Sequence, residues 1–96
     1  MAEAQYQREL IERIERLFPG CLVLKNDSGY LQGIPDLLVL WGKHWAMLEV
    51  KTHARAPYQP NQKYYLDWCA AMSFSAVIYP ANEQEVLSGL QRAFAD

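Results

Sequence analysis

The chain has 96 residues, enough for one domain with a modest hydrophobic core. Its hydrophobic fraction of 51% excludes a disordered tail and is typical of a globular domain. With 9 basic and 11 acidic residues, the formal net charge is −2, which excludes a protein that coats nucleic acid by charge alone. Cys21 and Cys69 lie far apart in apolar stretches, and we expect free thiols in a reducing cytoplasm. There is no signal-like start and no apolar run of about 20 residues, so no membrane association is expected.

The first predicted element is an amphipathic helix from Glu3 to Phe18. Its apolar residues Tyr6, Leu10 and Ile14 recur at three- and four-residue steps and so share one face. Pro19-Gly20 ends this helix. A short strand is predicted from Cys21 to Lys25, followed by a polar loop.

Two β-rich segments follow, from Ile34 to Trp41 and from Trp45 to Lys51. The three residues between them, Gly42-Lys43-His44, predict a hairpin connection. The next stretch, Thr52 to Asn61, contains two prolines and is predicted to be a loop.

The last third of the chain predicts a helix, a strand and a helix. Pro60 is placed to open the first of these helices, a strand is expected from Ser75 to Tyr79, and Asn82 is the expected N-cap of the last helix. The order α-β-β-β-α-β-α predicts an α/β domain over residues 1–96, with a mixed four-stranded sheet flanked by helices. A domain this small would gain burial by forming a homodimer.

Asp36, Glu49 and Lys51 are the strongest candidates for a chemical site. Alternate residues of a strand face the same way, so Glu49 and Lys51 project together while Val50 faces the opposite side. If the two segments pair as a hairpin, Asp36 at the start of one lies beside the end of the other. Two acids and an ammonium group would then converge.

Such a group could hold Mg²⁺ or Mn²⁺ through the two carboxylates, with the Val50 carbonyl as a further ligand. Lys51 could orient a water molecule or neutralise charge on a phosphate. The alternative is an ordinary surface ion pair. The apolar neighbours Trp45 and Met47 on the same face make that alternative costly.

Three segments of the sequence resemble the VRR-NUC domain, a branch of the PD-(D/E)XK nucleases: Gly33-Ile34-Pro35-Asp36, Glu49-Val50-Lys51 and the Gln62 that opens a helix. The resemblance spans almost the entire chain and includes Glu3-x-x-x-Gln7, which is similar to the opening of stand-alone phage and bacterial members. It implies a restriction-endonuclease-like core, Mg²⁺ or Mn²⁺ as cofactor and DNA as substrate. It also implies a protein of the bacterial cytoplasm, encoded by a bacterium, a phage or a prophage. By this resemblance Asp36 and Glu49 match the metal ligands, Lys51 the catalytic lysine and Gln62 a supporting glutamine.

The roles of Glu3 and Gln62 have alternatives. Glu3 and Gln7 fall on the inward side of the first helix, so Glu3 could approach the metal directly or through water. Glu3 could instead be a helix-dipole partner at a frayed terminus, and some related nucleases carry the acid at the position of Gln7. Gln62 could bind the attacking water or a phosphate, or it could satisfy backbone groups of the first helical turn.

Basic and polar residues near this centre are candidates for DNA contacts. Those around the proline-containing loop would bind phosphates without sequence preference, unless the loop is simply solvated and mobile. The candidate DNA contacts are Gln7, Lys25, Asn26, Ser28, His53, Arg55, Tyr58 and Lys63.

Three hypotheses for function follow. The first is a divalent-metal-dependent DNA endonuclease that cuts a Holliday junction, a flap or another branched DNA. Resolution of a four-way junction needs two opposed cuts, as a two-fold symmetric dimer would make, with Tyr64 and Trp68 as dimer candidates. The second is a non-catalytic DNA-binding module with the nuclease fold. The third is a plain α/β interaction protein in which Tyr64 and Trp68 mark a partner surface.

Overall fold

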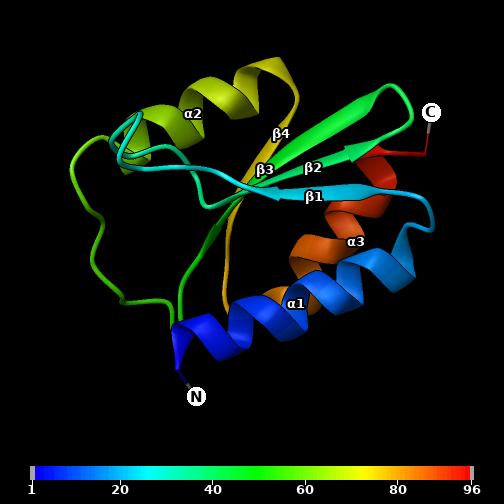
Figure 1. Ribbon diagram of the computed structural model, residues 1–96, viewed down its shortest axis with the longest axis horizontal. Helices are drawn as coiled ribbons and strands as arrows, with labels where there is room; N and C mark the ends of the chain where they lie inside the picture. The colour runs from blue at the N-terminus through cyan, green and yellow to red at the C-terminus, as the bar shows by residue number, and fades with distance from the viewer. Residues whose placement is uncertain (1, 96) are drawn as a thin grey trace.

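The computed structural model describes residues 2–95 and has the predicted order of elements (Figure 1). The elements are α1 (Glu3–Leu17), β1 (Leu22–Lys25), β2 (Leu37–Trp41), β3 (His44–Val50), α2 (Gln62–Met72), β4 (Phe74–Ile78) and α3 (Glu83–Ala93). The α/β class and the mixed four-stranded sheet are therefore confirmed.

The sheet has the strand order β1-β2-β3-β4. β1 pairs with β2 and β2 with β3 in antiparallel fashion, whereas β3 and β4 are parallel and are joined through α2. This connection is the βαβ crossover that parallel neighbours require. It returns the chain so that β3 and β4 both end at the same edge of the sheet.

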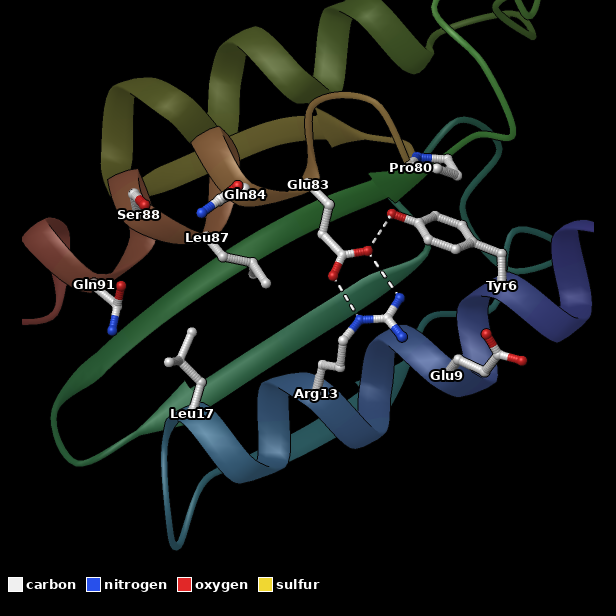
Figure 2. Close-up of a pocket in the computed structure, with 10 residues that line it drawn as sticks. All are labelled: Tyr6, Glu9, Arg13, Leu17, Pro80, Glu83, Gln84, Leu87, Ser88 and Gln91. Atoms are coloured by element: carbon white, nitrogen blue, oxygen red, sulfur yellow. Dashed lines mark hydrogen bonds and ion pairs between the residues drawn. The ribbon is translucent and has the colours of Figure 1, made fainter.

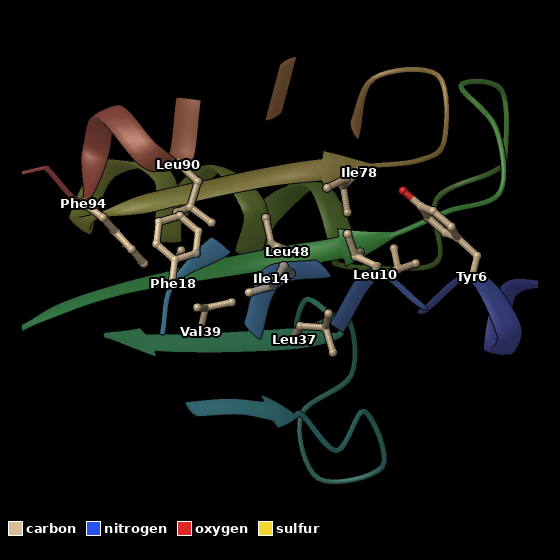
Figure 3. Packing of buried hydrophobic residues seen from close by; sticks show 12 residues of the cluster. Tyr6, Leu10, Ile14, Phe18, Leu37, Val39, Leu48, Ile78, Leu90 and Phe94 are labelled. Atoms are coloured by element: carbon tan, nitrogen blue, oxygen red, sulfur yellow. The ribbon is translucent and has the colours of Figure 1, made fainter. Parts of the chain in front are cut away.

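Helices α1 and α3 lie on one face of the sheet, and α2 lies on the other (Figure 1). The main core fills the space between the sheet and the α1/α3 layer, as Figure 3 shows. Alternation along β2 and β3 explains this, because Leu37, Val39 and Leu48 point into the core while their chain neighbours point to the α2 face. From α1, Leu10 and Ile14 complete the layer at helical spacing.

The hairpin and the start of β2 differ from the predicted boundaries. β2 begins at Leu37 instead of Ile34, since Pro35 has no N–H for a ladder bond. The hairpin loop has two residues instead of three, because His44 pairs with Trp41. Gly42 has a φ of +60° at the first central position, where a type II′ turn requires glycine.

The predicted starts of the last two helices are corrected as well. Pro60 does not open α2. The residue before that helix is Asn61, which has a left-handed φ of +70° and makes no side-chain cap. Asn82 precedes α3, but its side chain accepts a hydrogen bond from Tyr79 N–H and donates one to Val77 O instead of capping the helix. β4 spans Phe74–Ile78, one residue earlier than expected.

Within residues 2–95, no helix is long and apolar enough to cross a bilayer.

Candidate active site

The pairing of β2 with β3 brings the two predicted acids together. Leu37 is opposite Leu48, so the next residues outward are Asp36 and Glu49. Asp36 Oδ2 accepts a hydrogen bond of 2.8 Å from the backbone N–H of Val50. This bond fixes the Asp36 carboxylate beside the end of β3.

Glu49 is a buried acid, with 2% of its surface exposed. Its Oε2 accepts a hydrogen bond of 2.8 Å from Gln62 Nε2 and lies 3.5 Å from Lys51 Nζ. Its Oε1 is buried and has no hydrogen-bond partner among the described residues. A buried carboxylate oxygen without a partner is costly, and a bound cation would offset that cost.

Lys51 is also almost fully buried, at 7% exposed. Its Nζ donates to Pro57 O at 2.9 Å and to Gln62 Oε1 at 3.0 Å. The ring of Tyr58 has its centroid 5.7 Å from the same nitrogen. These three contacts hold the ammonium group in one position just after β3.

Gln62 connects the acid to the ammonium. While its Nε2 donates to Glu49, its Oε1 accepts from both Lys51 Nζ and the backbone N–H of Gln59, the latter at 2.7 Å. The amide oxygen is thus committed to the protein. In this structure Gln62 positions the two charged residues, and the prediction that it binds the attacking water stays untested.

Gly33 lets the segment before Asp36 pack against the turn before α2. Gly33 has a φ of +92°, and a Cβ atom built there would lie 2.6 Å from Cβ of Asn61 and 2.7 Å from Pro60 O. A larger residue would push these two segments apart. The positioning roles of Gly33, Pro57 O and Gln59 N–H were not predicted from the sequence; for Gly33 the available signal was a glycine close before a proline and an acid.

Burial raises the pKa values of both acids. Burial, followed by the negative charge of Asp36, raises the pKa of Glu49 to about 7, although Lys51 acts in the opposite direction. The pKa of Asp36 is also raised by burial, against the lowering effects of the Val50 N–H and Lys51. Close to neutral pH the metal-free pair therefore retains a proton that a bound cation would displace.

This donor set fits a hard divalent cation. Mg²⁺ is commonly bound by one or two carboxylates, with waters and substrate phosphate oxygens in the other positions. Asp36 and Glu49 supply two carboxylates, and Glu49 Oε1 is free to bind. Across residues 2–95, no three His, Cys, Asp or Glu side chains gather closely enough to form a larger metal-binding cluster.

Glu3 is not brought into this group. It is exposed in the first turn of α1, and Gln7, one turn later, is half-buried. The role of Glu3 at the metal thus stays a prediction. The role of the Val50 carbonyl as a metal ligand also stays a prediction. The contact of Val50 with the site is the hydrogen bond from its N–H to Asp36.

The predicted DNA contacts divide into two sets. Tyr58, His53 and Arg55 are exposed on the loop that contains Pro57, and Tyr58 lies beside Lys51. Their contacts with DNA stay a prediction. Lys63 is exposed but pairs with Asp67 at 2.9 Å. The other set lies at the end of β1, where Lys25 and Ser28 are exposed.

Asn26 has a structural role in addition to any contact with DNA. Its Nδ2 donates to Pro35 O at 2.8 Å, and its backbone N–H donates to Asp36 O at the same distance. Asn26 therefore anchors the loop after β1 to the residue that carries the first acid.

A hollow of about 620 Å³ lies between α1 and α3, away from the two acids, as Figure 2 shows. Three of its lining residues form a hydrogen-bond network: Glu83 accepts from Tyr6 Oη at 2.9 Å and from two nitrogens of Arg13 at 2.5 and 2.8 Å. Burial raises the pKa of Glu83, but the bonds from Arg13 and Tyr6 hold it below its usual value overall. We assign this network to the docking of α3 on α1.

Comparison with known proteins supports one assignment. No family model matches the sequence, and no curated protein matches it. A solved structure named VRR_NUC domain protein aligns with this chain at a TM-score of 0.66 and 16% identity, covering 99% of this chain and 89% of that chain. This chain has the VRR-NUC fold. The predicted resemblance is thus confirmed for the fold, across nearly the full length of the VRR-NUC-like chain.

Proposed function

We propose that this VRR-NUC-fold protein is a divalent-metal-dependent nuclease that hydrolyses phosphodiester bonds of DNA. The observation that carries the proposal is the convergence of Asp36 and Glu49, with the unpartnered Glu49 Oε1, beside the ammonium of Lys51. A protein named for a nuclease domain has the same fold. The fold alone is compatible with many activities, and this set of groups is what supports metal-assisted phosphoryl chemistry among them.

Each residue has a defined part in the proposed reaction. Mg²⁺ or Mn²⁺, when bound, supplies Lewis-acid polarisation of the phosphate and a water of lowered pKa. Asp36 and Glu49 hold the ion. Lys51 stabilises negative charge on the phosphate oxygens. Gln62 holds the side chains of Glu49 and Lys51 in place through its two hydrogen bonds. The loop with Tyr58 lies where it can contact the DNA backbone.

We further propose a branched DNA, such as a Holliday junction or a flap, as the substrate. Residues 2–95 form one four-stranded sheet with its helices, and the candidate DNA contacts near its strand ends are exposed basic and polar side chains. Such side chains bind phosphates without reading sequence, so the shape of the DNA is the property that they can select. Two opposed cuts in a four-way junction require two copies of the chain.

The test is a cleavage panel of single-stranded, duplex, flap and four-way substrates with Mg²⁺ or Mn²⁺. We expect nicking of the branched substrates and a loss of about 10³-fold or more for Lys51→Ala. The matched control is Lys43→Ala in the hairpin loop at the opposite end of β3, which should cut at the wild-type rate. Salt-dependent binding without cleavage under either metal would instead identify a non-catalytic DNA-binding module.

A further inference from the structure

The loop between β1 and β2 encloses a hollow beside the candidate active site. This loop folds back toward α2, where Gly33 packs against Asn61 (Figure 1). The hollow has a volume of about 460 Å³, which is within the range of small-molecule sites. Its lining residues come from the loop and from β3: Asn26, Asp27, Tyr30, Leu31, Ile34 and Met47.

Two of the lining residues connect the hollow to the two acids. The backbone N–H of Asn26 donates to Asp36 O at 2.8 Å. Met47 and Glu49 lie on the same face of β3, two residues apart, which is about 7 Å along a strand. In a nucleotide the base lies about that far from its own phosphate. A base in the hollow can therefore belong to a nucleotide whose phosphate lies at the acids.

The shape of the loop does not depend on the side chain of Tyr30. The backbone N–H groups of Tyr30 and Leu31 both donate to Asp27 O. Asp27 Oδ1 accepts a further bond of 2.8 Å from Gly29 N–H. The Tyr30 ring is 88% exposed, so it contributes little to the core. It lines the hollow without being needed for the fold.

The walls of the hollow suit the flat face of a nucleobase and do not suit a phosphate. Leu31, Ile34 and Met47 supply apolar surface, and a flexible methionine side chain adapts to the shape of its neighbour. Tyr30 supplies an exposed aromatic ring, the kind of group on which unpaired bases stack. None of the six lining residues is basic and Asp27 is acidic, so the lining repels a phosphate.

Two side-chain oxygens of the lining are free hydrogen-bond acceptors. Asn26 Nδ2 donates to Pro35 O at 2.8 Å and to Met47 Sδ at 3.3 Å, which fixes the orientation of the amide. Among the described residues, neither Asn26 Oδ1 nor Asp27 Oδ2 has a hydrogen-bond partner. Acceptors match the exocyclic amino groups of cytosine, adenine and guanine, which thymine lacks.

We propose that this hollow binds one unpaired base of the DNA, stacked on Tyr30, and prefers a base that carries an amino group. The inference rests on the proposed action on DNA, but it concerns binding and not the cleavage step. Removal of a paired base from a duplex costs free energy, whereas a base at a branch or in a flap is already unpaired. The hollow therefore supplies a physical reason for the selection of branched DNA over intact duplex.

A double-mutant cycle between Tyr30 and the bases of a flap substrate tests the proposal. Affinity is measured by fluorescence anisotropy in EDTA, which prevents metal-dependent cleavage, and at low salt, where phosphate contacts are strong. Tyr30→Ala should weaken binding about tenfold, and Tyr30→Phe, which keeps the ring, should not. A single abasic nucleotide, moved along the unpaired arm, should weaken wild-type binding about equally at one position. Tyr30→Ala should bind that abasic flap no more weakly than wild-type protein does.

Two further comparisons isolate the hollow and its base preference. Gln32→Ala is the matched control, because Gln32 is exposed on the same loop and does not line the hollow. Its effect should be the same for intact and abasic flaps. Cytosine at the sensitive position should bind about fivefold more tightly than thymine. Asp27→Asn replaces the free acceptor by a donor and should remove this preference.

The outcomes separate this proposal from the nuclease activity. Additive losses from Tyr30→Ala and the abasic nucleotide would overturn it, because Tyr30 would then act on the DNA backbone. So would an arm in which no abasic position weakens binding, or equal affinity for cytosine and thymine. Wild-type protein that does not bind the flap at all would overturn both this proposal and DNA as the substrate. A successful cycle without cleavage in any metal would support the base site and overturn the nuclease activity alone.

Discussion

Alternate residues of the same strands form the two faces of the sheet, and the two faces differ in how far they are buried. On the α1/α3 face, Leu37 and Leu48 are fully buried, and Arg13 pairs with Glu83 between the helices. On the α2 face, Leu38 of β2 and Met47 of β3 are only half-buried. Glu49 follows Met47 on this face of β3. One face is closed and the other is half open.

The closed face contributes most of the buried apolar core, whereas the end of the α2 face carries the charged side chains of the candidate site. An unpaired charge among the fully buried side chains of the closed face would have no polar partner, at high cost. At the end of the α2 face, a proline carbonyl and the Gln62 amide satisfy Lys51, and one oxygen of Glu49 is left for a ligand. The buried charges are thus tolerated because the loop before α2 folds back over the strand ends.

The largest expected effect is a difference in unfolding free energy between substitutions at two adjacent positions of β2, one on each face. Leu37→Ala creates a cavity in the closed core and should lower the free energy of unfolding by about 3 kcal/mol. Leu38→Ala, next along β2 and half-buried on the open face, should cost about 1 kcal/mol or less. Urea denaturation at low protein concentration, where association does not contribute, measures both. Equal losses would show that the open face is part of the same core.

A second prediction concerns the polar contact inside the closed face. Glu83→Ala removes the acceptor of Tyr6 Oη and the partner of Arg13, so we expect a loss of about 2 kcal/mol in unfolding free energy. The control is Asp67→Ala, which breaks the exposed pair with Lys63 and should change stability by less than about 0.5 kcal/mol. A Glu83 variant as stable as wild type would show that α3 docks by apolar packing alone.

A third prediction uses the raised pKa of Glu49 to separate the metal-free from the loaded site. Burial and the Asp36 charge raise this pKa from 4.5 to about 7, so between these pH values the folded protein binds more protons than the unfolded chain. Metal-free protein should therefore lose stability, on the order of 1–2 kcal/mol, as pH rises from about 5 to 8.

Two measurements check the cause of this pH dependence. Glu49→Gln removes the titrating group and should flatten the profile of unfolding free energy against pH. Under the proposed metal dependence Mn²⁺ would bind the deprotonated pair, so in its presence stability should rise over the same range. A profile unchanged by both would place the titration elsewhere.

Much of the architecture could be predicted because it depends on local periodicity. The helical spacing of Tyr6, Leu10 and Ile14 and the alternation along β3 are properties of the sequence itself. The same alternation, with hairpin pairing, was sufficient to bring Asp36 and Glu49 together.

The parts that could not be predicted depend on contacts between distant backbone groups. The bond from Lys51 to Pro57 O involves an atom that every residue has, so no residue type marks it. The start of α2 depends on the left-handed conformation of Asn61, which packs against Gly33. Proline at position 60 predicted a helix start there, but α2 begins at Gln62, after the left-handed Asn61.

The last prediction, and the smallest expected effect, tests whether Gln62 acts through its neighbours and rests on the proposed nuclease activity. Gln62→Ala leaves Lys51 with Pro57 O, but it removes the hydrogen-bond donor of Glu49 Oε2. The pKa of Glu49 should rise further, so the acid limb of the rate profile should move to higher pH and kcat should fall about tenfold. Gln59→Ala is the matched control, because Gln59 contacts Gln62 through its backbone N–H and alanine keeps that group. A uniform loss of rate without a shift of the acid limb would indicate that Gln62 acts on the water or the phosphate instead of on Glu49.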